Sequence, residues 1–206
     1  MRRSSLVGIP FLLCGGYFAF KWLLVSSLNA ERLVALGGMY HWTAMTLLVV
    51  GSCVWLVRER QHTGSFWGDF KKLSQPLVLY AMLASGSVWG WNHVVAVEST
   101  ALRKALRVAQ IEEHTATEKA YQSFLESQDQ GENVLHLPDR ETYRDQAKAQ
   151  VDWMLSGGVT LVLALLTYLF ASVLLVLVAT VLLHHCLLYT SPSPRDAHES
   201  RMPSSA

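Results

Sequence analysis

Two histidines, His41 and His93, have side chains that could bind a metal ion or a haem iron. Each lies among aromatic residues, in the tripeptides Tyr-His-Trp and Trp-Asn-His, near the end of a long apolar stretch. Two histidines that face one another can hold a haem iron from both sides. The same pattern is typical of polar residues at a membrane surface, where aromatic rings gather. Because no motif fixes the spacing of the pair, we assign no cofactor and no metal, and haem- or quinone-linked redox chemistry stays an alternative.

The remaining sequence contains no enzyme motif. It has no nucleophile elbow, phosphate-binding loop or HExxH zinc motif, and the carboxylates of Glu112 and Glu113 belong to a charged stretch that we expect to be solvated. The three cysteines form no CxxC pair, so neither a zinc site nor a disulfide framework is indicated. The net charge of +1 comes with no basic stripe, which argues against a nucleic-acid partner. We therefore expect a protein that is not an enzyme.

The composition indicates a membrane protein. Hydrophobic residues make up 51% of the 206 residues and charged residues only 16%. A helix of ~20 apolar residues crosses the hydrocarbon core of a bilayer. Four apolar stretches reach about this length, at residues 6–28, 38–57, 75–97 and 154–183. The sequence therefore predicts an all-α integral membrane protein with four transmembrane helices in one domain, residues 1–185.

Charged residues are nearly absent from the four predicted spans. Lys21 is the only one, and we expect its long side chain to extend to the headgroup layer as an anchor. No predicted span contains an acidic residue. Proton-coupled transporters usually carry a carboxylate inside the membrane, so this absence argues against that class.

The distribution of basic residues predicts the orientation. The short loop at residues 29–37 has only Arg32, which Glu31 balances. The N-terminus and the loop at residues 58–74 together carry six basic residues, namely Arg2, Arg3, Arg58, Arg60, Lys71 and Lys72. Loops rich in Lys and Arg remain in the cytoplasm. We therefore expect a multi-pass protein whose N-terminus and C-terminus are both cytoplasmic.

Aromatic residues mark two predicted membrane interfaces. Phe66, Trp67 and Phe70 share one helical face, which predicts a short amphipathic segment in the inner headgroup layer. Trp89 and Trp91 lie near the outer end of the third span, where amphipathic rings favour the interface.

Small residues in the third span predict a helix-packing surface. Gly86 and Gly90 are four residues apart, with Ala81 and Ser85 on the same side, so another helix could approach closely. Pro76 is expected in the first turn of this span, where the missing N–H is tolerated.

Residues 98–152 form a charged insert with 11 acidic and 7 basic residues. Its first part, to Glu113, is expected to continue the third helix. The pattern from Thr115 to Glu118 is a capping box and predicts a new helix start. Two stretches of equal length follow, 115–128 and 139–152, and we expect them to form an extracytoplasmic antiparallel helical hairpin.

The last residues, 186–206, differ abruptly from the helix before them. They begin CLLYTSPSPRD and end SRMPSSA, and both strings resemble a translated sequencing adapter. We therefore expect a truncated reading frame whose native part ends near His185. A disordered tail rich in proline and serine is the alternative.

The helical pair, the GSFWGDFKK turn before the third span, the charged insert and the long last span together resemble a family of bacterial membrane proteins. That family is known only as domain of unknown function four-one-nine-nine, and the resemblance covers most of residues 1–185. It implies the bacterial inner membrane and carries no catalytic residue. We expect a non-enzymatic structural or interaction protein that binds a membrane-protein partner or a second copy of itself through the hairpin. A small oligomeric transporter or channel is a further alternative.

Overall fold

The computed structural model describes residues 3–58, 65–128 and 139–190. These residues form seven α-helices, one π-helical turn and no strand, which confirms the predicted all-helical class. The elements are α1 (Arg3–Leu24), α2 (Ala30–Arg58), α3 (Phe66–Gly90), the π turn η1 (Trp91–Val95), α4 (Val97–His114), α5 (Glu118–Gln128), α6 (Arg140–Met154) and α7 (Gly157–Thr190). Arg2, Arg60 and residues 191–206 of the adapter-like tail lie outside the described residues.

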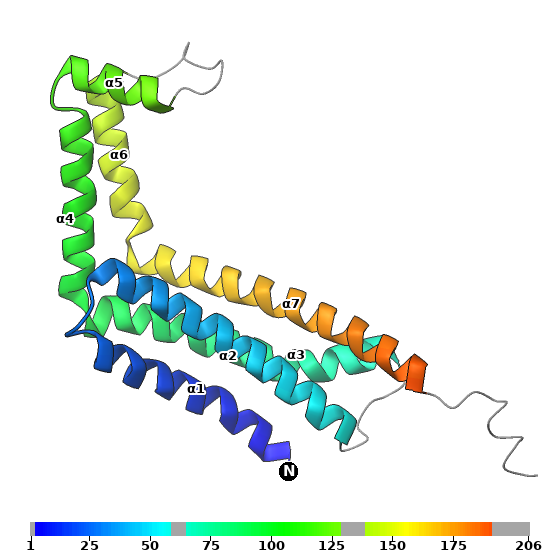
Figure 1. Ribbon diagram of the computed structural model, residues 1–206. Coiled ribbons are helices and arrows are strands. Elements are labelled where there is room, and N and C mark those ends of the chain that lie inside the picture. Colours follow the sequence, from blue (N-terminus) through cyan, green and yellow to red (C-terminus); the bar gives the residue numbers. More distant parts are fainter. Residues whose placement is uncertain (1–2, 59–64, 129–138, 191–206) are drawn as a thin grey trace, which may run out of the picture.

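Helices α1, α2, α3 and α7 lie side by side and form a bundle (Figure 1). Helix α3 is central, and it packs most extensively against α7 and also against α1 and α2. Its buried residues recur every three or four positions, so they form one continuous stripe: Leu73, Leu77, Tyr80, Ala81 and Ala84. The N-terminus, the end of α2, the start of α3 and the end of α7 lie together at one end of the bundle (Figure 1).

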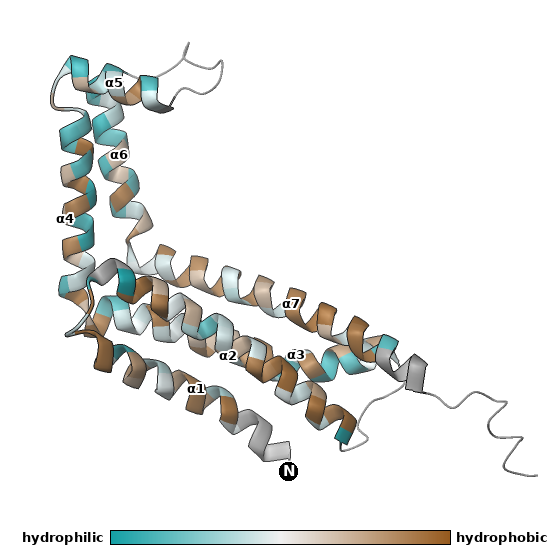
Figure 2. Ribbon diagram, in the orientation of Figure 1, coloured by the Kyte–Doolittle hydropathy of each residue, from teal (hydrophilic) through white to brown (hydrophobic). Residues whose placement is uncertain are grey.

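Two helices of the bundle are long and apolar enough to cross a membrane. These segments are Arg32–Arg58, with 27 residues, and Gly157–His185, with 29 residues. Helix α1 contributes a shorter apolar helix, Gly8–Leu24. Figure 2 shows that brown, hydrophobic residues dominate α1, α2 and α7, whereas α3 is more mixed.

Helix α3 corrects the predicted boundary between an amphipathic segment and the third span. It runs without interruption from Phe66 to Gly90, with Pro76 inside it instead of in its first turn. The side chain of Asp69 is fully buried, and its Oδ2 lies 3.3 Å from Nε2 of His184 on α7. Asp69 therefore packs against α7, although its segment was expected to lie in the headgroup layer.

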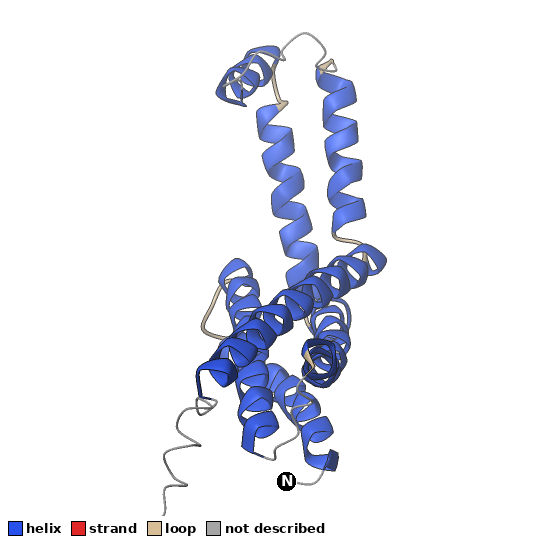
Figure 3. Ribbon diagram, turned by 90° about the vertical axis from the view of Figure 1, so that its right-hand side faces the viewer, coloured by secondary structure: helices blue, strands red, loops and turns tan. Residues whose placement is uncertain are grey.

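The insert projects from the bundle as an arm, which we define as α4, α5 and α6. Figures 1 and 3 show α4 and α6 leaving the bundle at a steep angle, with α5 lying across their far end. The expectation that α4 continues the direction of α3 is therefore wrong. The chain turns at Ala96, whose backbone (φ −115°, ψ 46°) is not helical.

The hairpin of the arm pairs different helices from those predicted. Helix α6 packs antiparallel to α4, whereas it was expected to pair with residues 115–128. Two ion pairs set the register, Lys104 to Asp152 at 2.9 Å and Lys148 to Glu112 at 2.7 Å. Equal segment length was a poor guide, because it says nothing about which helices contact each other in the folded chain.

Two predicted helix starts can be compared directly. The start of α6 is confirmed, because the Thr142 N–H donates to the Asp139 carboxylate at 3.2 Å. The start of α5 is shifted by two residues: the Ala120 N–H donates to the Thr117 hydroxyl at 3.1 Å. Thr115 is buried, and its hydroxyl donates to the Ile111 carbonyl of the preceding helix. The sequence around this helix start therefore offers two candidate N-cap residues, Thr115 and Thr117, and the structure uses Thr117.

Candidate functional site

His41 lies at the meeting point of all four bundle helices. It is fully buried, and its Nδ1 shares a hydrogen bond of 2.8 Å with the Tyr80 hydroxyl. Its ring centroid lies 4.3 Å from that of Tyr17 on α1 and 5.2 Å from that of Tyr168 on α7. We call His41, Tyr17, Tyr80 and Tyr168 the histidine–tyrosine cluster, to which each helix contributes one ring.

The second ring nitrogen of His41 has no hydrogen-bond partner among the described residues. If Nδ1 accepts from Tyr80, Nε2 carries a buried proton without an acceptor. Leaving such a group unsatisfied costs about 1–3 kcal/mol. Histidine and tyrosine are groups that can pass a proton along a hydrogen bond, and among the described residues the bond to Tyr80 is the one such contact that the His41 ring makes.

His93 does not join this cluster. It lies 13 residues after Tyr80, which corresponds to ~20 Å along a helix. Its ring is next to Trp89, with centroids 6.3 Å apart, and it faces Gly157 at the start of α7. The structure therefore does not bring His41 and His93 together for a shared haem iron. Among the described residues, no group of three or more His, Cys, Asp or Glu side chains is placed to hold a metal ion.

Lys21 is buried in the bundle, which corrects the expectation that it reaches the headgroup layer. Its side chain is 2% exposed, and Nζ lies 5.3 Å from the ring centroids of both Tyr17 and Trp91. Such placement over aromatic faces stabilises an ammonium group away from water. Gly37 makes the position possible, because a Cβ there would lie 2.6 Å from Cε of Lys21.

The five predicted interfacial aromatics divide into exposed and buried groups. Trp67 is 72% exposed, and Phe66, Phe70 and Trp89 are partly exposed. Trp91 is 2% exposed and packs beside Phe18, so its ring faces the interior of the bundle. Trp91 continues the buried stripe of α3 at ordinary helical spacing, after Tyr80, Ala84 and Ser87.

The predicted packing glycines make little contact within the chain. Gly86 is exposed, and nothing lies within 4 Å of the place where its Cβ would be. Gly90 meets only Phe18, at an ordinary distance of 3.8 Å. The close approaches occur in α1 and α2 instead: a Cβ on Gly16 would lie 2.6 Å from the Tyr40 hydroxyl, which donates to the Leu13 carbonyl.

A hydrogen-bonded junction joins the bundle to the arm at η1. The Ala96 N–H donates to the Trp91 carbonyl at 2.7 Å, five residues back, which is the π-helical pattern. The Arg103 guanidinium donates to the Asn92 side-chain oxygen and to the Thr100 hydroxyl, both at 3.0 Å. Burial lowers the pKa of this guanidinium from its usual value. These bonds hold the start of α4 in its new direction.

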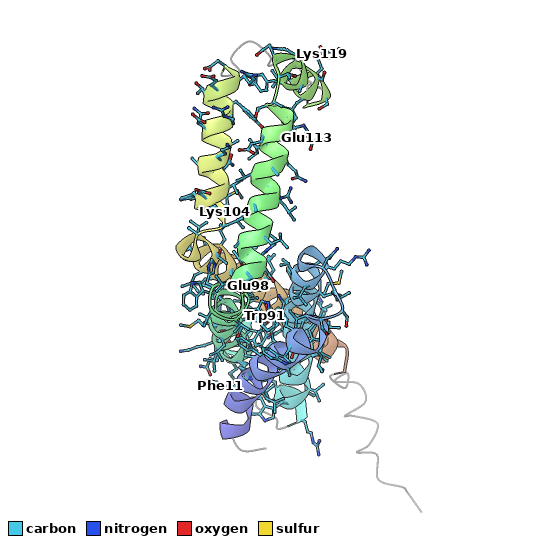
Figure 4. All side chains as sticks on the ribbon, turned by 90° about the vertical axis from the view of Figure 1, so that its left-hand side faces the viewer. Phe11, Trp91, Glu98, Lys104, Glu113 and Lys119 are labelled. Carbon is cyan, nitrogen blue, oxygen red and sulfur yellow. The ribbon has the colours of Figure 1, made fainter. Side chains whose placement is uncertain are left out.

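The arm has a charged surface and an aromatic far end. Figure 4 shows Glu98 near its base and Glu113 and Lys119 toward its far end. The Lys148 ammonium donates to the Glu112 carboxylate and holds the pKa of that carboxyl below its usual value. Rings from all three helices meet where α5 crosses, namely His114, Phe124, Tyr121 and Tyr143. The arm is thus stabilised by side-chain contacts at its base and at its far end.

Sequence reasoning missed the tyrosines of the cluster and the pair of Asp69 with His184. The sequence did contain a signal for the cluster. Tyr17, Tyr80 and Tyr168, like His41, each carry a polar group within an otherwise apolar stretch. Buried tyrosines usually find a hydrogen-bond partner, so such residues predict contact with one another. Asp69 offered no comparable signal, because its neighbours made it look like part of an exposed face.

The features above come from the chain alone, and the whole chain can also be compared with known proteins. No protein-family model, no curated protein and no solved structure matches this chain.

Proposed function

We propose that this chain is a four-helix protein of the bacterial inner membrane that binds a partner protein through its arm. One observation carries the membrane part: large apolar side chains cover the outside of the bundle as well as its core, and several polar or charged side chains are buried between its helices. Its exposed large side chains include Leu12, Trp22, Leu47, Phe170 and Leu182. Its buried polar side chains include Lys21, His41, Asp69, Ser85 and Ser172. Polar residues inside a membrane face the bundle interior, whereas a soluble protein shows the opposite distribution.

The charges at the two ends of the bundle support cytoplasmic termini. Arg58, Lys71 and Lys72 belong to the end of α2 and the start of α3, at the same end of the bundle as the N-terminus. The arm leaves the opposite end, so the positive-inside rule assigns it to the extracytoplasmic side. That the chain is related to the family known as domain of unknown function four-one-nine-nine, which it resembles, is part of the same proposal.

Single cysteines at Lys119 and Lys71 test this orientation in a variant whose own cysteines are replaced by serine or alanine. In intact spheroplasts we expect a membrane-impermeant maleimide to label the cysteine at position 119 and not the one at position 71. After lysis both positions should react. Labelling of position 71 alone in intact cells would reverse the proposed threading.

The shape and charge of the arm support a role in binding a partner. Helices α4 and α6 have no fully buried residue, so most of their length does not serve the bundle core. The insert has four more acidic than basic residues, 11 against 7, which favours a partner with a basic surface. An 18-residue helix such as α4 extends ~27 Å, and the ion pairs with α6 keep it stiff.

Site-specific photocrosslinking tests this role in native membranes. A photoreactive amino acid at Lys119 should give a discrete crosslinked band, either with a basic partner or with a second copy of the chain. The same probe at Leu12, an exposed residue of α1, is the control for lipid-facing positions. Glu113→Lys combined with Glu126→Lys should weaken the band from Lys119. Equal crosslinking from both positions, or indifference to charge reversal, would reject the arm as a partner surface.

Transport of a small ion is a second candidate function, favoured by the polar groups inside the bundle. Lys21 and His41 both lie close to the ring of Tyr17. Buried ionisable groups of this kind often mark ion or proton pathways in membrane proteins. Proteoliposomes that contain the chain should then carry a proton or ion flux, and Lys21→Met and His41→Leu should reduce it. A flux that both variants leave unchanged would exclude this pathway.

A further inference from the structure

A pocket lies in the corner between the base of the arm and the end of the bundle from which the arm leaves. Its volume is about 440 Å³. One face of α4 supplies most of the lining, because residues three or four positions apart share a helical face. The lining consists of Arg103, Leu106, Arg107 and Gln110 of α4, Val34 of α2, and Leu155 just before α7. Two cations and three apolar side chains therefore line one concave site.

The two arginines of the pocket have no carboxylate partner. In the part of the chain that the structure describes, neither guanidinium forms an ion pair with an acidic side chain. Four other basic residues of the insert do, and these pairs are Lys104–Asp152, Arg140–Glu118, Arg144–Asp145 and Lys148–Glu112. The insert has 11 acidic and 7 basic residues, so carboxylates are plentiful. Two neighbouring arginines that lack such a pair therefore favour an anion from outside the chain.

The hydrogen bonds of Arg103 orient its guanidinium and leave one end of it without an acceptor. Its Nη2 donates to Asn92 and Thr100, both at 3.0 Å. Its Nη1 bonds to no described residue, and this nitrogen is not fully buried. Arg107 is exposed and makes one long hydrogen bond, of 3.4 Å, to the side-chain oxygen of Gln110. Each arginine therefore has N–H groups available to an anion.

The pocket lies at the depth of lipid headgroups when the bundle crosses the membrane as proposed. Val34 is two residues inside the apolar segment Arg32–Arg58, and Leu155 is two residues before the apolar segment Gly157–His185. Two residues correspond to ~3 Å along a helix, so both side chains mark the outer end of the bundle. The arm leaves this end steeply to one side (Figures 1 and 3), so α4 extends over the membrane surface beside the bundle.

We propose that this pocket binds a phospholipid of the outer leaflet, with the lipid phosphate at Arg103 and Arg107 and the glycerol and upper acyl chain against Val34, Leu106 and Leu155. The inference rests on the proposed insertion of the bundle in a membrane. Guanidinium groups present N–H donors in a geometry that matches phosphate oxygens. A free phosphate ion has no use for the apolar walls, whereas a phospholipid has hydrocarbon close to its phosphate. A lipid bound here joins the base of the arm to the membrane surface.

Competition between a phospholipid and a glycolipid tests the recognition of the phosphate. The full chain is reconstituted in vesicles that hold equal amounts of phosphatidylglycerol and of a monoglucosyl diacylglycerol with the same acyl chains. After extraction in mild detergent, the lipid that remains bound is identified by native mass spectrometry. We expect phosphatidylglycerol to be enriched about tenfold, since one hydrogen bond between charged groups is worth at least the corresponding ~1.4 kcal/mol. Displacement of the lipid by inorganic phosphate would show instead that the site binds a free anion.

Variants locate the site. Gln110→Glu is nearly isosteric and places a carboxylate beside Arg107, so it should reduce the enrichment severalfold. Arg107→Gln should do the same, and it leaves the hydrogen bonds of Arg103 in place. The variant that combines Arg103→Gln with Arg107→Gln should bring the ratio close to one. Arg144→Gln, the matched control, removes an arginine of the arm that pairs with Asp145 and should leave the enrichment unchanged.

Three further results would overturn the proposal. They are a ratio of one in the unchanged protein, an enrichment that survives the double variant, and an equal loss with Arg144→Gln, which would reflect only the general charge of the arm. Resistance of each variant to extraction from vesicles by alkaline carbonate is measured in parallel. A chain that remains in the membrane but shows no preference for phospholipid disproves the lipid site alone. A chain that carbonate removes instead contradicts the proposed membrane insertion.

Discussion

The bundle and the arm are both helical, but they differ in where their polar and apolar side chains lie. In the bundle, polar groups such as His41 and Asp69 are inside, and large apolar side chains cover the outside. In the arm, charged side chains are outside and pair across the two helices, as Lys104 does with Asp152. Figure 2 shows this contrast as brown helices in the bundle and mixed teal helices in the arm.

Under the proposed membrane insertion, the bundle and the arm follow different packing rules. Helices in a membrane gain little from burying apolar side chains against each other, so close contacts and internal polar contacts decide how they associate. Helices in water are stabilised by apolar contacts and weakly by exposed ion pairs. The same substitution should therefore have different effects in the two regions.

The largest contrast is expected from removing a tyrosine ring. Tyr80→Ala in the bundle removes a fully buried ring and the hydrogen bond to His41, so we expect a loss of about 3–5 kcal/mol in the free energy of unfolding. Tyr143→Ala removes ring contacts at the far end of the arm and should cost about 1 kcal/mol. Unfolding by sodium dodecyl sulfate in mixed micelles, followed by circular dichroism, measures both. Equal losses would show that the bundle core is not organised around the cluster.

A charge placed on the surface should separate the regions almost as strongly. Leu174 of α7 is 45% exposed and Leu102 of α4 is 55% exposed. Leu174→Asp should cost about 3 kcal/mol of apparent insertion free energy if α7 faces lipid. Leu102→Asp should change stability by about 0.5 kcal/mol or less. The membrane-integrated fraction after alkaline extraction provides the measurement. Tolerance of aspartate at position 174 would place α7 away from lipid.

Contacts between polar side chains give a smaller contrast of the same sign. His184→Ala removes a partner of the fully buried Asp69 carboxylate and should cost about 1–3 kcal/mol. Lys148→Ala breaks an exposed pair with Glu112 and should cost less, because water and salt screen exposed charges. The same detergent titration compares the two variants. A larger loss of stability for Lys148→Ala than for His184→Ala would contradict the expectation that buried polar contacts stabilise the chain more than exposed ones.

The smallest expected effect is a response of the arm to acid. The bond from Lys148 lowers the pKa of Glu112 from its ordinary value of 4.5. Its contribution to stability is therefore complete above the unfolded pKa, and it is lost as pH falls through the lower, folded pKa. We expect spin labels on α4 and α6 to show a broader distance distribution at pH 3 than at pH 7. Lys148→Met should make the distribution less dependent on pH, whereas an unchanged response would assign it to other carboxylates.

Local features of the chain were predictable because they depend on residues within one or two helical turns. The all-helical class, the apolar stretches within α2 and α7 and the Asp139 cap follow from periodicity, length and side-chain chemistry. The continuous helix through Pro76 was missed, since tertiary contacts can override the local preference of proline.

The sequence by itself determined that the chain is helical and where its apolar and charged segments lie. Only the tertiary structure decided that His41 joins three tyrosines while His93 does not, that α6 pairs with α4, and that Lys21 and Trp91 face inward. The reason is geometric: successive residues on a helix are rotated by ~100°, so a small change in helical phase moves a side chain to another face. Contacts between helices depend on that phase and on crossing direction, which no short stretch of sequence contains.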